Sequence, residues 1–319
     1  MPTPTHRRKL WGTLAKVTVL VVVLVFVGRS VAGAGRQLAT QRVRPHAGYL
    51  AASGAAYLLG LAPMAWFWRR ALAGLGQPCR WRDVLPAYYL GHLGKYVPGK
   101  AMVVVLRTGA IHRAGGETAP VAASAVVETL TMMAVGAVVA SLLLALLGAR
   151  EVDLGWLAPL AVSLAVIAAA PTLPPVMRRL LPRLAPRSAA SAAGITWKLI
   201  AAGWFAGLMT WLGMAASLWL AVRSLDDGVE LSVEATMRCA LAVTLPVVAG
   251  FLSLLPGGLL VRDGLMFALL KPLAGLAEPT ALAATLLLRL TWVVSEAFAC
   301  VMLTIGRKLA GVGSQTARS

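Results

Sequence analysis

Residues Leu130–Gly148 read LTMMAVGAVVASLLLALLG, an apolar run without a single charged side chain. A helix rises about 1.5 Å per residue, so a run of this length covers most of the roughly 30 Å hydrocarbon core of a bilayer. Runs of similar length lie at Tyr49–Trp68 and Leu154–Pro171, and a shorter one lies at Lys16–Val27. Several such runs exclude a single membrane anchor and predict an all-α protein that crosses the membrane many times.

The composition of the whole chain agrees with membrane insertion. Of its 319 residues, 59% are hydrophobic and 13% are charged, whereas soluble domains average about 45–50% apolar and about 25% charged residues. The formal net charge of +18 would suggest a nucleic-acid partner for a soluble protein. Here the basic residues lie mainly between the apolar runs, where they act as topology signals and contact lipid headgroups. We therefore predict no nucleic-acid partner.

Six full spans are predicted within one transmembrane domain that covers residues 1–319. They lie at about residues 14–34, 47–68, 118–149, 154–173, 197–222 and 280–306. The first run continues past Val27 to Arg29 and Gly33 without a small-x-small cleavage site, so we interpret it as a retained span rather than a signal peptide.

The stretch Val84–Arg113, VLPAYYLGHLGKYVPGKAMVVVLRTGAIHR, does not fit a simple span. Pro98 and Gly99 divide it, because proline removes a helix hydrogen bond and glycine weakens the helix. Each arm has about 13 residues, or roughly 20 Å of helix, which is too short to cross. We predict a re-entrant hairpin that enters the membrane and leaves it on the same side.

The stretch Glu234–Leu270 is broken in a similar way, within LPGGLLVRDG. The tip residues are Pro256, Gly257 and Gly258. The first arm has about 21 residues, which is long enough to span, but Pro246 interrupts it and favours a second hairpin. A spanning first arm stays open as the alternative.

The order span, span, hairpin, span occurs twice, in pseudo-repeats of about residues 10–150 and 151–310. Each contains an odd number of full spans, so the second repeat is inverted relative to the first. Inverted repeats whose broken helices meet near the midplane are a common transporter plan. With both termini in the cytoplasm, the cytoplasmic segments carry most of the Lys and Arg residues, as the positive-inside rule requires.

Charged residues in or near the embedded segments are the informative set, because a charge at the centre of a span costs about 2.5–3.5 kcal/mol on insertion scales. Such side chains usually face a cavity or a partner. They are Lys95, Lys100, Arg107, Glu128, Arg262, Asp263, Arg289 and Glu296.

Four of these residues are predicted to bind a lipid phosphate. Lys95, Lys100 and Arg107 flank the first hairpin tip, where free helix N–H groups and cationic side chains suit an anion. The alternative for the two lysines is that they snorkel to the interface. Arg262 follows the second tip and is the fourth ligand, oriented by Asp263, unless the two form only a local surface pair.

Glu128, Arg289 and Glu296 lie within spans, and Arg289 and Glu296 share one helix face because seven residues separate them. They form either a buried ion pair that fixes helix packing or, with Asp263, a gate or proton-coupled site. Several aromatic residues are interpreted as interfacial anchors. These are Trp66, Trp68, Trp81, Tyr88 and Tyr89.

Enzymatic and metal chemistry lack a signal in the sequence. The three cysteines and four histidines do not have the spacing of metal ligands, so we predict no metal site. No nucleophile–base–acid arrangement and no Walker lysine is found, so we predict no catalytic residue and no cofactor.

The segment GHLGKYVPGK with Arg107 downstream, and FLSLLPGGLLVRDG followed by LLLRL and Glu296, resemble the transmembrane domain of lysylphosphatidylglycerol synthases. The resemblance covers nearly the whole chain. It implies a stand-alone, flippase-like domain that acts on anionic or aminoacylated lipids, without the cytosolic aminoacyl-transfer domain of the full synthases. Two positions depart from the family pattern: its Gly-x-Arg-Glu is Leu260-Val261-Arg262-Asp263 here, and the polar residue near the first motif is His92.

The main hypothesis is a lipid translocase of a bacterial plasma membrane, in which an anionic, aminoacylated or polyprenyl-phosphate-linked headgroup passes between the two hairpins. Its partners would be membrane lipids, and a second copy or a separate synthase could associate with it. The resemblance keeps open a membrane enzyme or subunit of polyprenyl-phosphate sugar assembly, because some stand-alone relatives belong to such pathways. A structural scaffold is the third hypothesis.

Overall fold

The computed structural model describes residues 45–96, 101–151, 157–184, 193–226, 228, 230–253, 261–270 and 276–316. Within these residues the chain is helical and forms no strand, which confirms the predicted all-α class. Some predicted features lie outside the described residues. These are the span at about residues 14–34, Lys100, and the hairpin-tip residues Pro98, Gly99, Pro256, Gly257 and Gly258.

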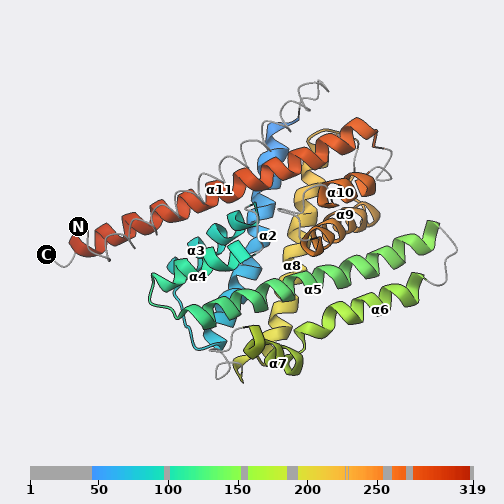
Figure 1. Ribbon diagram of the computed structural model, residues 1–319. Helices are drawn as coiled ribbons and strands as arrows, with labels where there is room; N and C mark the ends of the chain where they lie inside the picture. Colours follow the sequence, from blue (N-terminus) through green and yellow to red (C-terminus); the bar gives the residue numbers. More distant parts are fainter. Residues whose placement is uncertain are drawn as a thin grey trace, which may run out of the picture.

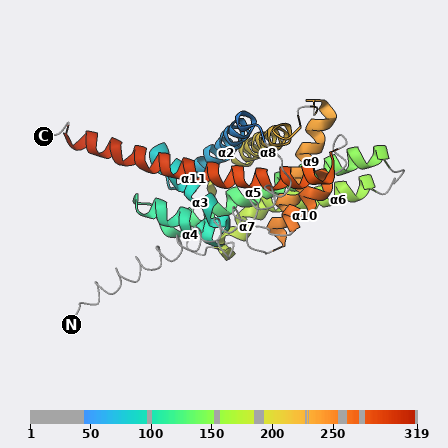
Figure 2. The same cartoon turned by 90° about the horizontal axis from the view of Figure 1, so that it is seen from above.

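Five of the described helices are long and apolar enough to cross a membrane. They are α2 (Ala47–Gly74), α5 (Thr118–Glu151), α8 (Trp197–Arg223), α9 (Val233–Leu252) and α11 (Glu278–Thr316). α11 runs across the molecule as one continuous helix, with α2, α3 and α10 beside it (Figure 1; Figure 2). The protein is therefore a multi-pass α-helical membrane protein.

The first predicted hairpin corresponds to two short helices that pack against each other. α3 (Trp81–Leu93) continues into a 3₁₀ turn, η1 (Gly94–Tyr96), and α4 (Ala101–His112) follows. A Cβ on Gly94 would lie only 2.9 Å from the backbone nitrogen of Val103, so this glycine permits the close approach of the two arms. Neither helix is long enough to span by itself.

The second predicted hairpin has unequal arms. α9 continues through Pro246 for 20 residues, and it packs against the short α10 (Val261–Leu270). By length and apolar composition α9 can cross a membrane, which is the alternative that the sequence left open. Proline does not end the helix here, because α9 is packed on both α5 and α8 and such contacts hold a proline-containing helix together.

The predicted span at about residues 154–173 is bent in the structure. α6 (Leu157–Ala169) ends in a 3₁₀ turn, η2 (Ala170–Thr172), and α7 (Pro174–Leu184) then turns away by 57°. Pro171 and the Pro174–Pro175 pair lie at this bend, where proline disfavours a continuing helix. The segment is a broken span or a re-entrant loop.

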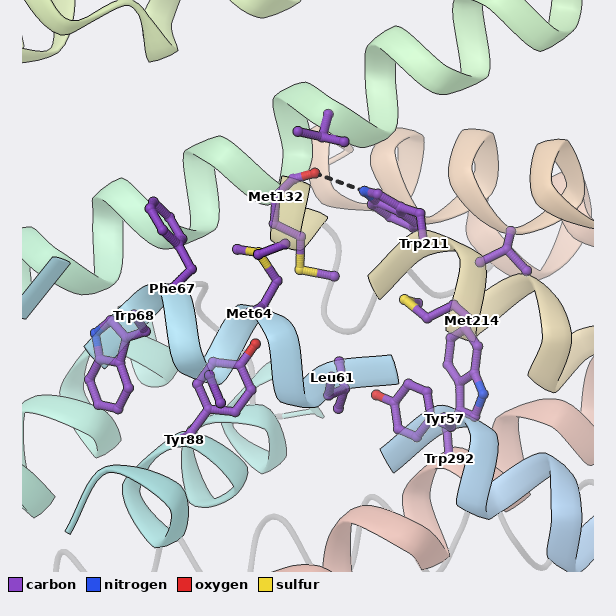
Figure 3. Close-up of a cluster of buried hydrophobic side chains, with 14 of the residues drawn as sticks. Tyr57, Leu61, Met64, Phe67, Trp68, Tyr88, Met132, Trp211, Met214 and Trp292 are labelled. Carbon is purple, nitrogen blue, oxygen red and sulfur yellow. Dashed lines mark hydrogen bonds between the residues drawn. The ribbon is translucent and has the colours of Figure 1, made fainter. Parts of the chain in front are cut away.

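The core forms where α2 crosses α8, with α3, α5 and α11 packed around them (Figure 3). The backbones touch at Gly60 and Gly213: a Cβ on Gly213 would lie 2.5 Å from the Cα of Gly60. Trp211 on α8 fills the next layer, and its indole N–H donates to the carbonyl oxygen of Met132 on α5 at 3.0 Å (Figure 3). Small residues at a crossing allow such close packing inside a membrane.

Replacing Gly213 with alanine should destabilise the protein by about 1–3 kcal/mol, because the new methyl group meets backbone that cannot move aside. Thermal unfolding in detergent, followed by tryptophan fluorescence, measures the effect. Gly306→Ala in α11 is the matched control, since nothing lies within 4 Å of a Cβ there. Equal melting temperatures for the two variants would contradict the tight crossing.

The packing of the helices has a paired pattern. α2 packs on α5 as α8 packs on α11, and α4 packs on α5 as α10 packs on α11. Likewise α3 contacts both α4 and α11, while α9 contacts both α10 and α5. These contacts match when α2 corresponds to α8, α3 to α9, α4 to α10 and α5 to α11.

Candidate functional site

The first buried ion pair joins α4 to α5. The Arg107 guanidinium donates to Oε2 of Glu128, and each side chain is only 2% exposed. The Tyr88 hydroxyl of α3 donates to the other carboxylate oxygen, Oε1, at 3.1 Å. We call Arg107, Glu128 and Tyr88 the α4–α5 pair. The opposite charges of Arg107 and Glu128 neutralise each other, while Nε of Arg107 is buried without a hydrogen-bond partner among the described residues.

Aromatic rings enclose the guanidinium of this pair. The Cζ atom of Arg107 lies 4.3 Å from the ring centre of Tyr88 and 5.1 Å from that of Trp68, and both rings are fully buried (Figure 3). Gly91 leaves the room for this arrangement, because a Cβ there would lie 2.5 Å from Cγ of Arg107. Trp68 and Tyr88 were predicted to be interfacial anchors, and this prediction is wrong. Both side chains are buried beside the Arg107–Glu128 ion pair.

The second buried carboxylate is Glu296 of α11, whose side chain is fully buried. It accepts hydrogen bonds from the Lys95 ammonium of η1 and from the Tyr57 hydroxyl of α2. Lys95 also donates to the Tyr57 oxygen at 2.9 Å, and the Tyr57 ring stacks on Trp292 with centres 4.6 Å apart (Figure 3). We call Glu296, Lys95 and Tyr57 the hairpin–α11 pair.

The third carboxylate, Asp263 of α10, is shared by two arginines. Nε of Arg262 donates to its Oδ1 at 3.1 Å, and Arg289 of α11 donates to its Oδ2. The two arginine side chains are 9% and 10% exposed. Both lie within electrostatic range of Lys95 and Tyr96 at the end of the first hairpin's first arm. We call Arg262, Asp263 and Arg289 the arginine pair site.

His92 of α3 connects two of these groups. Its ring lies 4.8 Å from the Tyr88 ring, and its Nδ1 lies 3.8 Å from Oε1 of Glu296. Its Nε2 is buried without a hydrogen-bond partner in the described part of the chain. A line of polar groups therefore runs from Glu128 through Tyr88 and His92 to Glu296.

The structure thus brings together most of the predicted site residues. Arg289 and Glu296 were predicted on one helix face, with ion pairs to other helices as one interpretation, and in the structure Arg289 binds Asp263 and Glu296 binds Lys95. Tyr57 and the bridging role of His92 were missed by the sequence reasoning. An ordinary aromatic residue inside an apolar run carries no signal of this kind.

Metal binding finds no support in the described residues, which contain no group of three or more His, Cys, Asp and Glu side chains able to hold an ion. The absence of a cofactor remains a prediction.

Tyr57→Phe should cost about 1.5–3 kcal/mol, because it removes a hydrogen bond to a buried carboxylate and keeps the stacking on Trp292. Chemical or thermal unfolding in detergent would show it. Tyr49→Phe is the control: its hydroxyl has a long 3.5 Å contact with Arg223, and we expect a change below about 0.5 kcal/mol. A stable Tyr57→Phe variant would show that Lys95 alone satisfies Glu296.

Buried ion pairs at the junction of a short-helix hairpin with long apolar helices define this chain as an integral membrane protein with an internal polar site. It belongs to the lysylphosphatidylglycerol synthase transmembrane-region family, whose sequence model matches residues 13–295. This match confirms the resemblance seen in the motifs. No protein with curated annotation matches the chain significantly in sequence.

Proposed function

We propose that the protein is a lipid translocase, in which a phosphate-bearing headgroup crosses the membrane beside the buried charges while the acyl chains stay in the bilayer. The observation that carries this proposal is the arrangement of the buried cations. Lys95 of the first hairpin, Arg262 of the second and Arg289 of α11 lie within electrostatic range of one another. Family membership supports a role connected with membrane lipids.

Packing alone is a weaker explanation for these residues. Buried ion pairs add little net stability compared with apolar residues of similar volume, and charges inside spans are rare unless they serve a pathway. Arg289 and Glu296 both lie well inside the candidate span Glu278–Gly306, more than about 14 Å of helix from either end. A scaffold has no need for three such carboxylates.

The paired packing pattern supports the predicted inverted repeat. In this proposal α2–α5 and α8–α11 are the described parts of two repeats, and each repeat contributes one hairpin to the site. Transporters built this way place the substrate between repeats, near the midplane. Lys95 belongs to one hairpin and Arg262 to the other, as expected for a site between two repeats.

The predicted residues then take separate roles. Lys95, Arg262 and Arg289 contact the lipid phosphate, together with Lys100 from the first tip. Glu296 and Asp263 hold these cations when no lipid is present and release them to it, which is the gating role. The α4–α5 pair positions the first hairpin, because Arg107 is bound to Glu128 and lies beside the rings of Tyr88 and Trp68. We place the protein in the plasma membrane with both termini in the cytoplasm.

Reconstitution tests this proposal. Liposomes that contain the purified protein and a trace of phosphatidylglycerol carrying a fluorophore on an acyl chain are treated with an impermeant quencher. Translocation predicts that labelled lipid from the inner leaflet becomes accessible to the quencher faster than in protein-free liposomes. A soluble marker trapped in the vesicle lumen should be retained. An unchanged rate with correctly folded protein would contradict the proposal. Turnover of a nucleotide sugar by the same preparation would instead favour the enzyme hypothesis.

A further inference from the structure

We infer that the headgroup this site accepts is a net anionic phosphate ester, and that the site discriminates against an aminoacylated, cationic headgroup. The inference rests on the proposed function and names its substrate class. It concerns the charge balance of the three groups described above: the α4–α5 pair, the hairpin–α11 pair and the arginine pair site.

Every embedded carboxylate is already bound to a cation of the protein. The chain has 12 Asp and Glu residues, and those within the embedded segments are Glu128, Asp263 and Glu296. Glu128 accepts from Arg107, Asp263 from two arginines and Glu296 from Lys95. An incoming ammonium group would have to compete with a tethered cation, and a displaced cation would be left buried without a counter-charge. Oε2 of Glu296 is buried without a hydrogen-bond partner among the described residues, but it belongs to a carboxylate whose charge Lys95 already neutralises.

The aromatic faces around these carboxylates are occupied as well. The Lys95 ammonium lies 5.5 Å from the ring centre of Tyr57 and 5.0 Å from that of Tyr96. Arg107 lies in the same way over the rings of Tyr88 and Trp68. A quaternary or primary ammonium is commonly held by such rings, and here cations of the protein already use them.

The balance of charge is positive at the arginine pair site. Two arginines share the single carboxylate of Asp263, so this group carries a surplus positive charge. A surplus cation inside a membrane protein favours an anionic ligand.

The two arginines also have donors to offer. The Nε of Arg289 is buried without a hydrogen-bond partner among the described residues, and a guanidinium has five N–H donors in a planar fork that matches two phosphate oxygens. The two arginines therefore have N–H donors that can bind a phosphate as Asp263 releases them. The geometry suits a phosphate monoester or diester without an attached amino group.

A series of lipids that share a diacylglycerol phosphate but differ in headgroup charge tests this inference. Native mass spectrometry of the full chain measures the retention of anionic phosphatidylglycerol, zwitterionic phosphatidylethanolamine and cationic lysylphosphatidylglycerol, each supplied at the same concentration. We expect retention to fall in that order, with at least a roughly tenfold preference for phosphatidylglycerol over its lysyl ester. Equal retention, or a preference for the lysyl ester, would overturn the inference.

A single substitution tests whether the preference for anionic lipid depends on the arginine pair site. Arg289→Gln leaves Asp263 paired with Arg262 and should reduce the preference for phosphatidylglycerol over phosphatidylethanolamine by roughly three- to tenfold. Arg238→Gln, at a half-buried arginine paired with the exposed Glu234 on α9, is the control and should retain the preference. A preference that survives Arg289→Gln in folded protein would place the anion elsewhere and overturn the assignment to the arginine pair site.

Two further experiments distinguish a failure of this inference from a failure of the proposed lipid translocation. Retention of phosphatidylglycerol should persist in excess inorganic phosphate, because the acyl chains contribute to binding; complete displacement would show a site for free phosphate and overturn the lipid assignment. In the liposome assay, transport of all three lipids at one rate would overturn the inference while the translocase stands. Selective binding of phosphatidylglycerol without any transport would contradict the proposed translocase function and would leave the inference about headgroup charge intact.

Discussion

Arg107→Met should strongly destabilise the protein, by about 3–5 kcal/mol, because Glu128 would remain charged and buried without its cation. Glu128→Gln should have an effect of similar size, since it leaves the buried guanidinium beside the rings of Tyr88 and Trp68 without a counter-charge. Melting temperatures in detergent, combined with the fraction of monodisperse protein on size exclusion, measure both losses.

The double variant Arg107→Met/Glu128→Gln separates packing from function at this pair. Both charges are gone, and glutamine can still accept the Tyr88 hydrogen bond, so we expect stability within about 1 kcal/mol of the wild type. Because the α4–α5 pair has a positioning role, lipid transport should also stay within roughly threefold of the wild-type rate. A stable double variant that no longer transports would instead indicate that Arg107 binds the lipid phosphate, as predicted from the sequence.

The hairpin–α11 pair should behave differently. Lys95→Met leaves Glu296 with Tyr57 and the more distant His92, and the unpaired carboxylate should cost several kcal/mol. The double variant Lys95→Met/Glu296→Gln should recover the stability, because no buried charge is left unpaired.

Transport by this second double variant should stay at least roughly tenfold below the wild type, since the cation that meets the lipid phosphate is missing. The comparison between the two double variants is internally matched: each exchanges one buried ion pair for methionine and glutamine. Recovery of both stability and transport in the Lys95→Met/Glu296→Gln variant would contradict a ligand role for Lys95.

Local sequence signals predicted the helices and the first break well. Apolar runs identified α2, α5, α8 and α11 because span length is fixed by the bilayer. Proline alone was ambiguous: Pro246 lies inside an unbroken α9, whereas Pro171 and Pro174 lie at the 57° bend between α6 and α7. The difference depends on neighbouring helices, which a single stretch of sequence does not report.

The charged residues of the site could be predicted, but their partners could not. A charge inside an apolar run is conspicuous in any sequence, which is why Lys95, Arg107, Glu128 and Glu296 were singled out. The contact between Lys95 and Glu296 joins residues 201 positions apart, and it depends on how α3 and α11 pack. Tyr57 could not be predicted for the same reason, because its hydroxyl joins the polar site only through the packing of α2 against α11, which brings Glu296 beside it.

The most direct test of the account is the initial rate at which labelled phosphatidylglycerol crosses the bilayer in proteoliposomes with Arg262→Gln/Asp263→Asn/Arg289→Gln. This variant removes all three charges of the arginine pair site together, so no buried charge loses its partner and the fold should persist. We predict a rate close to that of protein-free liposomes, while Arg238→Gln transports like the wild type. A folded triple variant that transports at the wild-type rate would contradict the proposal that the lipid phosphate crosses at these arginines.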